Sequence, residues 1–398
     1  MDNNIKFNVQ FYNGAFVEII GEEGKEYGDD YSYEVIFLDN DTNKLIHSTT
    51  LGVNYWTKPN LKYFANWKVV IMQNNVGIVH EEVMNLNGKE VLIVIENKPL
   101  GDNISWIPYC EEFRKKHNCN VTVQTFFPDL FEKSYPEIKF QKTYTTQLND
   151  PQYYASYKIA YGFSDSEVKE FRTFIDKTKG KLNYYPFAKI HKSDETPNHP
   201  ALQPLQKMAS DILGLEHKEL RPKFIVENEV RPIEKKYVCI SEFASGKLKM
   251  WSNKVGWQTL VDELKLRGFE VVSISKEKSD LKNITKRNGN YSLLDRIWYL
   301  NHCEFFIGVS SALAWLAWGC NKKVVMISGI THKWNEFQED NIRIINEDVC
   351  HGCWNSNQHC DKFAQFLSDF CPENKRWECS RKISPKMVIN QLLENNLI

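Results

Sequence analysis

The pattern of hydrophobic and polar positions changes near residue 90 of this 398-residue chain. Before that point, residues 31–38 and 45–51 are rich in strand-forming residues and flank a polar turn, which predicts a β-hairpin. A further strand is expected to begin at Trp67. Because no helical period of any length appears in this part, we expect residues 1–89 to form a small β-rich domain.

Residues 90–97 form a continuous apolar run with the length of a buried parallel strand. A turn is expected at 98–102, a helix in 103–119 and a second strand at 120–127. Strand, turn, helix and strand within about forty residues make a βαβ unit. With weaker signals that follow, residues 90–225 are predicted to form a first Rossmann-like domain.

A second alternation of apolar strands and amphipathic helices runs from 236 to 328 and predicts a second parallel sheet, in a domain spanning 226–341. Periodicity is then lost in 342–383, which contains a cluster of cysteines. Ser384 followed by a proline starts a terminal helix, expected over 384–398. The fold class predicted is therefore α/β, with two Rossmann-like domains.

Charge and hydropathy exclude several classes of protein. Lys and Arg number 50 against 51 Asp and Glu, so no basic field is available to attract nucleic acid. No apolar run approaches the roughly 18–20 residues of a membrane span. The N-terminal residues lack the charged and apolar regions of a secretory signal, and we expect a cytoplasmic protein.

Gly101 and Asp102 follow the first predicted parallel strand, at the edge where open α/β sheets bind ligands. We expect Gly101 to permit a tight turn. With an ordinary pKa of ~4, Asp102 is ionised at neutral pH and is able to accept a hydroxyl proton as a general base. The alternative is that Asp102 only caps the following helix.

Lys249 precedes the helix expected near Gly256, where its ammonium would contact a phosphate. Trp251 and Trp257 would form walls of the same site. The alternative is a solvent-facing lysine beside core tryptophans, because exposure is the usual state of lysine.

A third candidate is the helix start that follows the apolar strand ending before Ser310. Ser310 and Ser311 are expected to cap this helix, and the free amides of Ser311, Ala312 and Leu313 would bind an anion. The alternative is a capped core helix without a ligand.

Four cysteines have the spacing of a metal site: Cys350 and Cys353 form a C-x2-C pair, and Cys371 and Cys379 follow. Four thiolates suit a tetrahedral zinc or iron, and we expect a structural metal, one per chain, rather than free thiols. Cys360 is a fifth candidate.

In this order, these motifs resemble the bacterial heptosyltransferases, and more closely the autotransporter heptosyltransferases. The resemblance lies in PLGDNISWIPY from residue 99, in Lys249-Met250-Trp251, in FFIGVSSALAWLAW from residue 305 and in CHGCWN from residue 350. It implies a GT-B fold, with two Rossmann-like domains facing a cleft, an N-terminal β domain and an iron-binding cysteine finger.

The resemblance also implies an inverting transfer of heptose from ADP-heptose to serines in the strand-loop-strand repeats of an autotransporter passenger. Asp102 would be the base, Lys249 would stabilise the departing diphosphate, and no catalytic divalent metal would be needed. Iron, or zinc in its place, would be bound by Cys350, Cys353, Cys371 and Cys379, and the assembly would be a ring-shaped dodecamer. The nucleotide sugar would contact Pro99, Leu100, Gly101, Lys249, Trp251, Ser310, Ser311, Ala312 and Leu313.

Two alternatives stay open. One is a related transferase that uses another nucleotide sugar or a lipopolysaccharide acceptor, against which the finger and the β domain argue. The other is a zinc-ribbon protein that binds nucleic acid, for which the chain offers only a short basic cluster near the cysteines. This cluster comprises Lys375, Arg376, Arg381 and Lys382.

Overall fold

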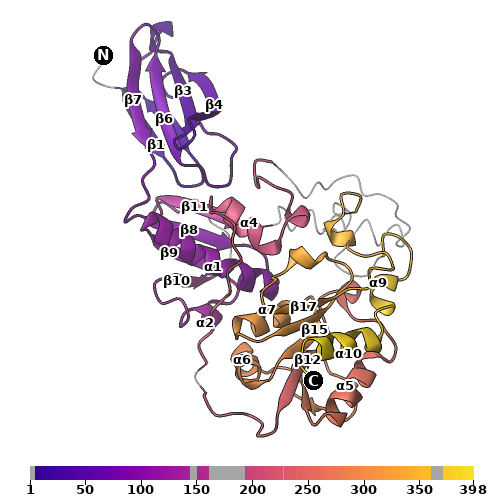
Figure 1. Ribbon diagram of the computed structural model, residues 1–398. Coiled ribbons are helices and arrows are strands. Elements are labelled where there is room, and N and C mark those ends of the chain that lie inside the picture. The colour runs from indigo at the N-terminus through magenta and orange to yellow at the C-terminus, as the bar shows by residue number, and fades with distance from the viewer. Residues whose placement is uncertain (1–4, 144–149, 161–192, 227, 360–370) are drawn as a thin grey trace.

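The computed structural model describes residues 5–143, 150–160, 193–226, 228–359 and 371–398 (Figure 1). Its N-terminal part contains two antiparallel sheets, ordered β1-β2-β5 and β4-β3-β6-β7. The predicted hairpin is confirmed, because β3 and β4 pair antiparallel across the polar turn. The strands are β1 Lys6–Gln10, β2 Phe16–Ile20, β3 Tyr33–Asp39, β4 Lys44–Leu51, β5 Trp56–Thr57, β6 Trp67–Gln73 and β7 Gly77–Val83. A 3-10 turn, η1, covers Asp29–Tyr31.

A four-stranded parallel sheet follows, in the order β10-β9-β8-β11. The expected strands at 90–97 and 120–127 are present, but the first helix begins three residues earlier than predicted, at Leu100. Pro99 is the N-cap of this helix, since its fixed φ suits a helix start. The elements are β8 Glu90–Ile95, α1 Leu100–His117, β9 Asn120–Thr125, α2 Pro128–Phe131, β10 Lys139–Lys142, β11 Ala155–Ile159, η2 Pro200–Leu202 and α4 Leu205–Ile212.

The second parallel sheet has six strands in the order β14-β13-β12-β15-β16-β17, the doubly wound order in which the first strand lies beside the fourth. The predicted alternation is thus present. The elements are β12 Tyr237–Ser241, η3 Lys247–Lys249, α5 Gly256–Leu266, β13 Glu270–Ser273, β14 Thr285–Lys286, α6 Leu293–His302, β15 Phe306–Val309, α7 Ala312–Gly319, β16 Val324–Ile327, η4 Lys333–Asn335 and β17 Asn341–Ile344.

Strand β17 was not predicted, and the expected boundary between residues 341 and 342 cuts through it. β17 is an edge strand in which Asn341 and Arg343 alternate with two isoleucines, so it lacks the apolar run of a central parallel strand. The second α/β unit therefore extends at least to Ile344.

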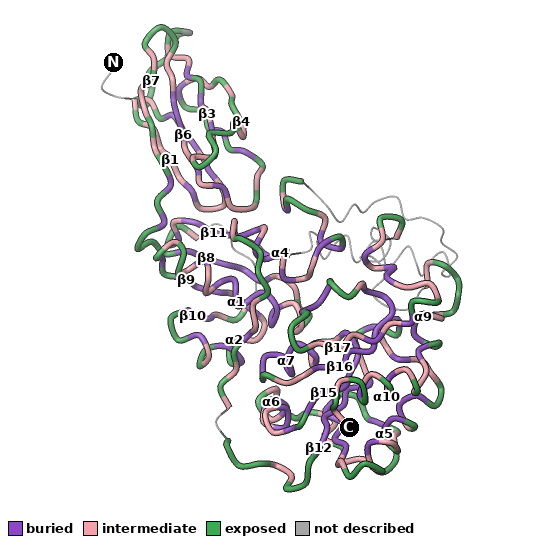
Figure 2. Tube along the Cα trace, viewed as in Figure 1, coloured by how far each residue is buried: buried purple, intermediate pink, exposed green. Residues whose placement is uncertain are grey.

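Helices lie on both faces of the second sheet, and its strands β12, β15 and β16 are buried between them (Figure 2). Helices α6 and α7 pack on one face, in an apolar cluster that continues into the first sheet and the N-terminal strands. Helices α5 and α10 (Pro385–Glu394) cover the other face. Side chains alternate along β12 between the two clusters, Tyr237 and Cys239 in the first and Val238 and Ile240 in the second.

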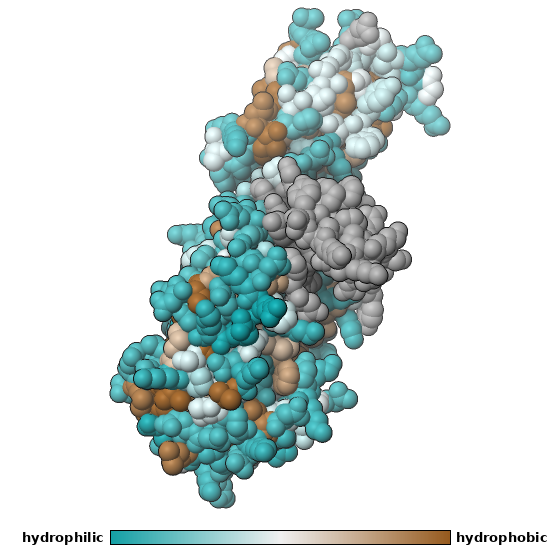
Figure 3. All heavy atoms as spheres, turned by 90° about the vertical axis from the view of Figure 1, so that its right-hand side faces the viewer, coloured by the Kyte–Doolittle hydropathy of each residue, from teal (hydrophilic) through white to brown (hydrophobic). Residues whose placement is uncertain are grey.

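The C-terminal part contains η5 (Cys353–Asn355) and α9 (Glu378–Arg381) before the terminal helix α10. The predicted start of α10 is confirmed, because the Ser384 hydroxyl accepts a hydrogen bond from the backbone of Met387. In the described parts of the chain, no helix has the length and apolar character to cross a bilayer. Figure 3 shows small apolar groups, including one over the N-terminal strands, separated by hydrophilic surface.

Candidate active site

Asp102 lies in the first turn of α1, directly beyond the carboxyl end of β8. Its carboxylate accepts a hydrogen bond from the side-chain amide of Asn97 at 3.1 Å. The interpretation of Asp102 as an N-cap is wrong, because Pro99 holds that position and no side chain caps the helix. The carboxylate is thus available for a role other than capping.

The loop before α1 is held by Asn103, which is fully buried. Its side-chain amide donates to the carbonyls of Asn97 at 2.7 Å and Pro99 at 2.8 Å. Its side-chain oxygen accepts from the hydroxyl of Thr125, at the end of β9, at 2.6 Å. The polar groups of Asn103 therefore fix the loop from Asn97 to Pro99, directly before the helical turn that carries Asp102. Helical spacing alone did not reveal this role.

The environment of Asp102 favours a proton-accepting group that titrates near neutrality. Burial raises the pKa of Asp102 to about 6, whereas the hydrogen bond from Asn97 and the charge of Lys249 act to lower this pKa. A catalytic base is most effective when its pKa is near the working pH. Lys249 lies in η3 of the second α/β unit, so the two predicted catalytic residues are brought together by the fold.

Gly101 lies in the first turn of α1, so the expected tight turn is not formed. The absence of a side chain at Gly101 instead affects how closely α7 approaches α1. A Cβ atom at Gly101 would lie 3.5 Å from the Cα atom of Ala312 and 3.6 Å from the ring of Trp315. Helix α1 thus packs on α7 near the first turns of both helices. The two helix starts predicted as ligand sites lie side by side.

The start of α7 has an unused hydroxyl group. Ser311 is the N-cap residue, but its side chain makes no capping hydrogen bond, contrary to expectation. Its Oγ atom is buried and has no hydrogen-bond partner within the described residues. The first amides of an α-helix also lack partners inside the helix, so this end of α7 offers donors for an anion.

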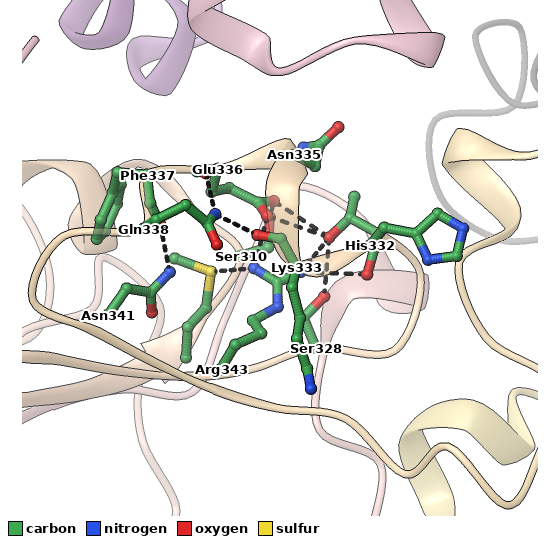
Figure 4. Close-up of polar contacts among 12 residues, drawn as sticks. Ser310, Ser328, His332, Lys333, Asn335, Glu336, Phe337, Gln338, Asn341 and Arg343 are labelled. Carbon is green, nitrogen blue, oxygen red and sulfur yellow. Dashed lines mark hydrogen bonds and ion pairs between the residues drawn. The ribbon is translucent and has the colours of Figure 1, made fainter. Parts of the chain in front are cut away.

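Ser310 does not cap the helix either, because its hydroxyl donates to the carboxylate of Glu336 at 2.6 Å (Figure 4). Glu336 is buried and pairs with Arg343 of β17 at 2.5 Å, while the hydroxyl of Thr331 also donates to it. A buried carboxylate needs such partners. This network fixes the loop before Ser311, and its members Glu336 and Arg343 were not predicted from the sequence.

Trp251 and Trp257 do not line an exposed site, and the alternative interpretation is correct for both. Trp251 is 4% exposed, and its indole N–H donates to the carbonyl of Ile383 at 2.9 Å. The two rings meet edge to face, with centroids 5.2 Å apart. A Cβ at Gly256 would overlap the ring of Trp251. Trp251 therefore supports the chain beside Lys249 without itself forming a wall of the site.

A second buried carboxylate, Glu242, follows β12 at the same edge of the second sheet. The hydroxyls of Ser273 and Ser279 donate to it at 2.9 and 2.8 Å. Burial raises its pKa. Glu242 could not be predicted as a site residue from the sequence, because a lone glutamate after a strand has no distinctive spacing.

The four predicted metal ligands gather around η5 and α9. Cys353 and Cys379 are buried in one cluster with Leu248 and Ile330. Burial, followed by the charges of the neighbouring thiols, raises the pKa of Cys353 and of Cys379 to about 12 each. As placed, no three His, Cys, Asp or Glu side chains among the described residues form a metal-binding group. Cys360 lies outside the described residues.

These elements define the class. Two parallel sheets are joined through the packing of α1 on α7, which makes an α/β fold with two sheet-containing halves, and this is the fold of a known glycosyltransferase. The solved structure of the iron-containing dodecameric glycosyltransferase TibC has this fold: it superposes with a TM-score of 0.79, at 24% identity, covering 100% of this chain and 97% of that one. A further structure of TibC holds ADP-D-β-D-heptose.

No family profile matches the chain. It is 28% identical to the autotransporter heptosyltransferase Aah of Escherichia coli over 89% of this chain and 87% of that protein. It is 28% identical to TibC of E. coli O78:H11 over 96% and 88%. The inactive autotransporter heptosyltransferase BimC of Burkholderia thailandensis is 27% identical over 78% and 70%. These relatives confirm the predicted resemblance to autotransporter heptosyltransferases and the predicted enzyme class, a glycosyltransferase.

Proposed function

We propose that this chain is an inverting glycosyltransferase that transfers heptose from ADP-heptose to serines of an autotransporter adhesin. The observation that carries the proposal is the meeting of Asp102, Lys249 and the start of α7 at the junction of the two parallel sheets. The relatives Aah and TibC are named autotransporter heptosyltransferases, and TibC has been solved with ADP-D-β-D-heptose.

Each group has a role in the transfer. The serine oxygen attacks the anomeric carbon from the face opposite the diphosphate, and its proton passes to the carboxylate of Asp102. The bond between the anomeric carbon and the diphosphate oxygen breaks, and ADP leaves with the electron pair. Lys249, the Ser311 hydroxyl and the first amides of α7 stabilise the departing charge. These donors make a catalytic divalent metal unnecessary.

Resemblance to the autotransporter heptosyltransferases does not by itself imply activity, because the relative BimC is named an inactive one. Activity depends on a base in the correct protonation state and on donors for the leaving group. Asp102, with its raised pKa, and the Ser311 hydroxyl, which has no hydrogen-bond partner among the residues that the structure describes, meet these needs here. We infer that this chain is active.

The domain scheme fits a GT-B enzyme. We infer a β domain over 1–89, an acceptor domain over 90–225, a nucleotide-sugar domain over 226–344, a cysteine finger that ends at 383 and a helix over 384–398. In this scheme, Asp102 is presented by the acceptor domain and the diphosphate donors by the nucleotide-sugar domain. The reaction then takes place between them.

We further propose that Cys350, Cys353, Cys371 and Cys379 bind one structural iron, as TibC is iron-containing. The donor set fits, because four thiols of a C-x2-C pair and two later cysteines suit a tetrahedral ion. Such an ion would hold the finger in shape and take no part in the transfer. By the same relationship, we propose a ring-shaped dodecamer. The nine described cysteines form no disulfide, which suits the cytoplasm.

The proposal is tested by incubating the intact protein with an autotransporter passenger fragment and one nucleotide sugar at a time. We expect ADP-heptose to increase the passenger mass by one or more heptosyl units, with the modification on serine. Transfer from another nucleotide sugar alone, or to lipopolysaccharide alone, would favour the related transferase. Binding of nucleic acid that weakens with salt, without any transfer, would favour the zinc-ribbon alternative.

A further inference from the structure

Asn355 lies where three distant segments meet. It ends η5, two residues after Cys353, and is 7% exposed. Its side-chain oxygen accepts from the backbone N–H of His332 at 2.8 Å. Its amide group donates to the carbonyl of Ala201 at 2.6 Å and to the side-chain oxygen of Asn335 at 2.8 Å. Both N–H donors of Asn355 are therefore used, each on a different segment.

The contact with Ala201 connects Asn355 to the first parallel sheet. Ala201 belongs to η2, which leads directly into α4. The carbonyl of Leu205, at the start of α4, accepts from the indole N–H of Trp106 at 2.9 Å, and Gln206 donates to the carbonyl of Ser105 at 3.1 Å. Both of these partners lie in α1, one turn after Asp102. The first arm of the connection therefore runs from Asn355 through η2 and α4 to the helix that carries the proposed base.

The contacts with His332 and Asn335 connect Asn355 to the second sheet. They hold both ends of η4, directly before Glu336. Glu336 in turn accepts the hydroxyl hydrogen of Ser310, the residue before Ser311 (Figure 4). This second arm therefore ends on the loop that would contact the diphosphate.

We propose that Asn355 is a positioning residue that fixes the spacing between the proposed base and the diphosphate loop. The inference rests on the proposed function for its effect on the rate, and on the hydrogen bonds alone for its structural part. The proposal gives the cysteine finger a role in the transfer. Asn355 lies in η5 of the finger, beside Cys353, and its hydrogen bonds connect the two halves of the site.

Asn355→Asp tests this directly, because it retains the oxygen that accepts from His332 and removes both N–H donors. Asn346→Asp is the matched control. Asn346 is 8% exposed, donates to the carbonyl of Lys382 at 2.8 Å and accepts from the backbone of Asp348 at 3.1 Å. Its contacts stay within the C-terminal part and include neither arm of the connection.

For Asn355→Asp we expect kcat for transfer from ADP-heptose to fall about tenfold to 100-fold, because small displacements of reacting groups are costly. The Kd for ADP should stay within about threefold, since the Ser310–Glu336 bond is intact. Amide hydrogen exchange should accelerate in residues 199–206 and 330–337. Asn346→Asp should produce neither effect.

Equal kcat values and equal exchange in the two variants would overturn the inference. A wild-type chain that transfers no heptose would refute the proposed function, while the exchange comparison would still decide the structural part. If circular dichroism shows that Asn355→Asp is unfolded, Asn335→Ala replaces it, because this change removes one of the two contacts that join Asn355 to η4 and leaves the bonds to His332 and Ala201. It should lower kcat in the same direction, and an unchanged kcat would count against the inference.

Discussion

The charge of Lys249 lowers the pKa of the Asp102 carboxylate, although the two residues belong to different α/β units. Asp102 lies in α1, which follows the first strand of one parallel sheet, and Lys249 lies in η3, which follows the first strand of the other. Burial has the larger effect and raises the pKa of Asp102 to about 6. The base is thus ionised at neutral pH, yet basic enough to accept a hydroxyl proton. Only the folded chain brings these two charges together.

Asp102→Asn should abolish transfer and preserve nucleotide binding. The amide has the shape of the carboxylate and still accepts from Asn97, but it cannot take a proton. We expect kcat to fall about 100-fold or more, with the Kd for ADP nearly unchanged by isothermal calorimetry. Transfer at a near-normal rate would remove Asp102 from the mechanism.

The same variant should be more stable than the wild type. A pKa raised in the folded state means that ionised Asp102 opposes folding, so its stability contribution worsens as pH rises from about 4 to about 6 and stays unfavourable above. At pH 7.5 we expect Asp102→Asn to raise the free energy of unfolding by about 1–3 kcal/mol. At pH 4 this gain should largely disappear in urea titrations.

Lys249→Met should weaken binding of the diphosphate. Methionine keeps much of the apolar stem of lysine and removes its charge. We expect the Kd for ADP to rise about tenfold to 100-fold, and the rise to shrink as salt increases. Lys247→Met, in the same turn but exposed, is the control and should leave the Kd unchanged. Equal effects of the two changes would argue against a specific phosphate contact.

Alanine substitutions of the neighbouring residues Ser310 and Ser311 should have different effects on the stability of the protein. Ser310→Ala deprives buried Glu336 of a hydrogen bond and should cost about 1–3 kcal/mol of stability. Ser311→Ala removes a buried hydroxyl that has no partner within the described residues, so stability should be unchanged or higher. The Kd of Ser311→Ala for ADP should nevertheless rise about tenfold. An unchanged Kd would show that this hydroxyl does not face the diphosphate.

Metal analysis tests the cysteine site. Intact protein should contain about one equivalent of iron or zinc per chain. Cys353→Ser and Cys379→Ser should lose the metal and lower the melting temperature, because a structural ion contributes to folding. Cys119→Ala is the control, since Cys119 is a buried thiol close to the first sheet. Full metal content in both serine variants would refute the proposed ligand set.

The strands and helices of the two parallel sheets could be predicted because buried apolar runs and helical periods are local signals. Edge strands such as β17 could not, since polar residues interrupt them. The start of α1 was placed too late, because proline and glycine ahead of Asp102 indicate a turn as readily as a first helical turn.

The site was predictable only in part. Asp102, Lys249 and Ser311 could be proposed from the sequence because they follow strands or begin helices, and their roles stay predictions. Glu336 and Arg343 are far from Ser310 in sequence, and their buried ion pair follows from tertiary packing. The role of Trp251 was misassigned because an aromatic residue beside a lysine is compatible with both a site wall and a core position, and only its burial distinguishes them.

The pH dependence of kcat/KM for heptose transfer, measured for the wild type and Lys249→Met, tests the account most directly. For the wild type, the rate should rise with pH to a plateau with a midpoint near the pKa of about 6 that burial gives Asp102. Because the charge of Lys249 lowers this pKa, the midpoint of Lys249→Met should lie higher. A profile without a midpoint between about pH 5 and 7, or a midpoint that Lys249→Met leaves in place, would contradict the pairing of Asp102 with Lys249.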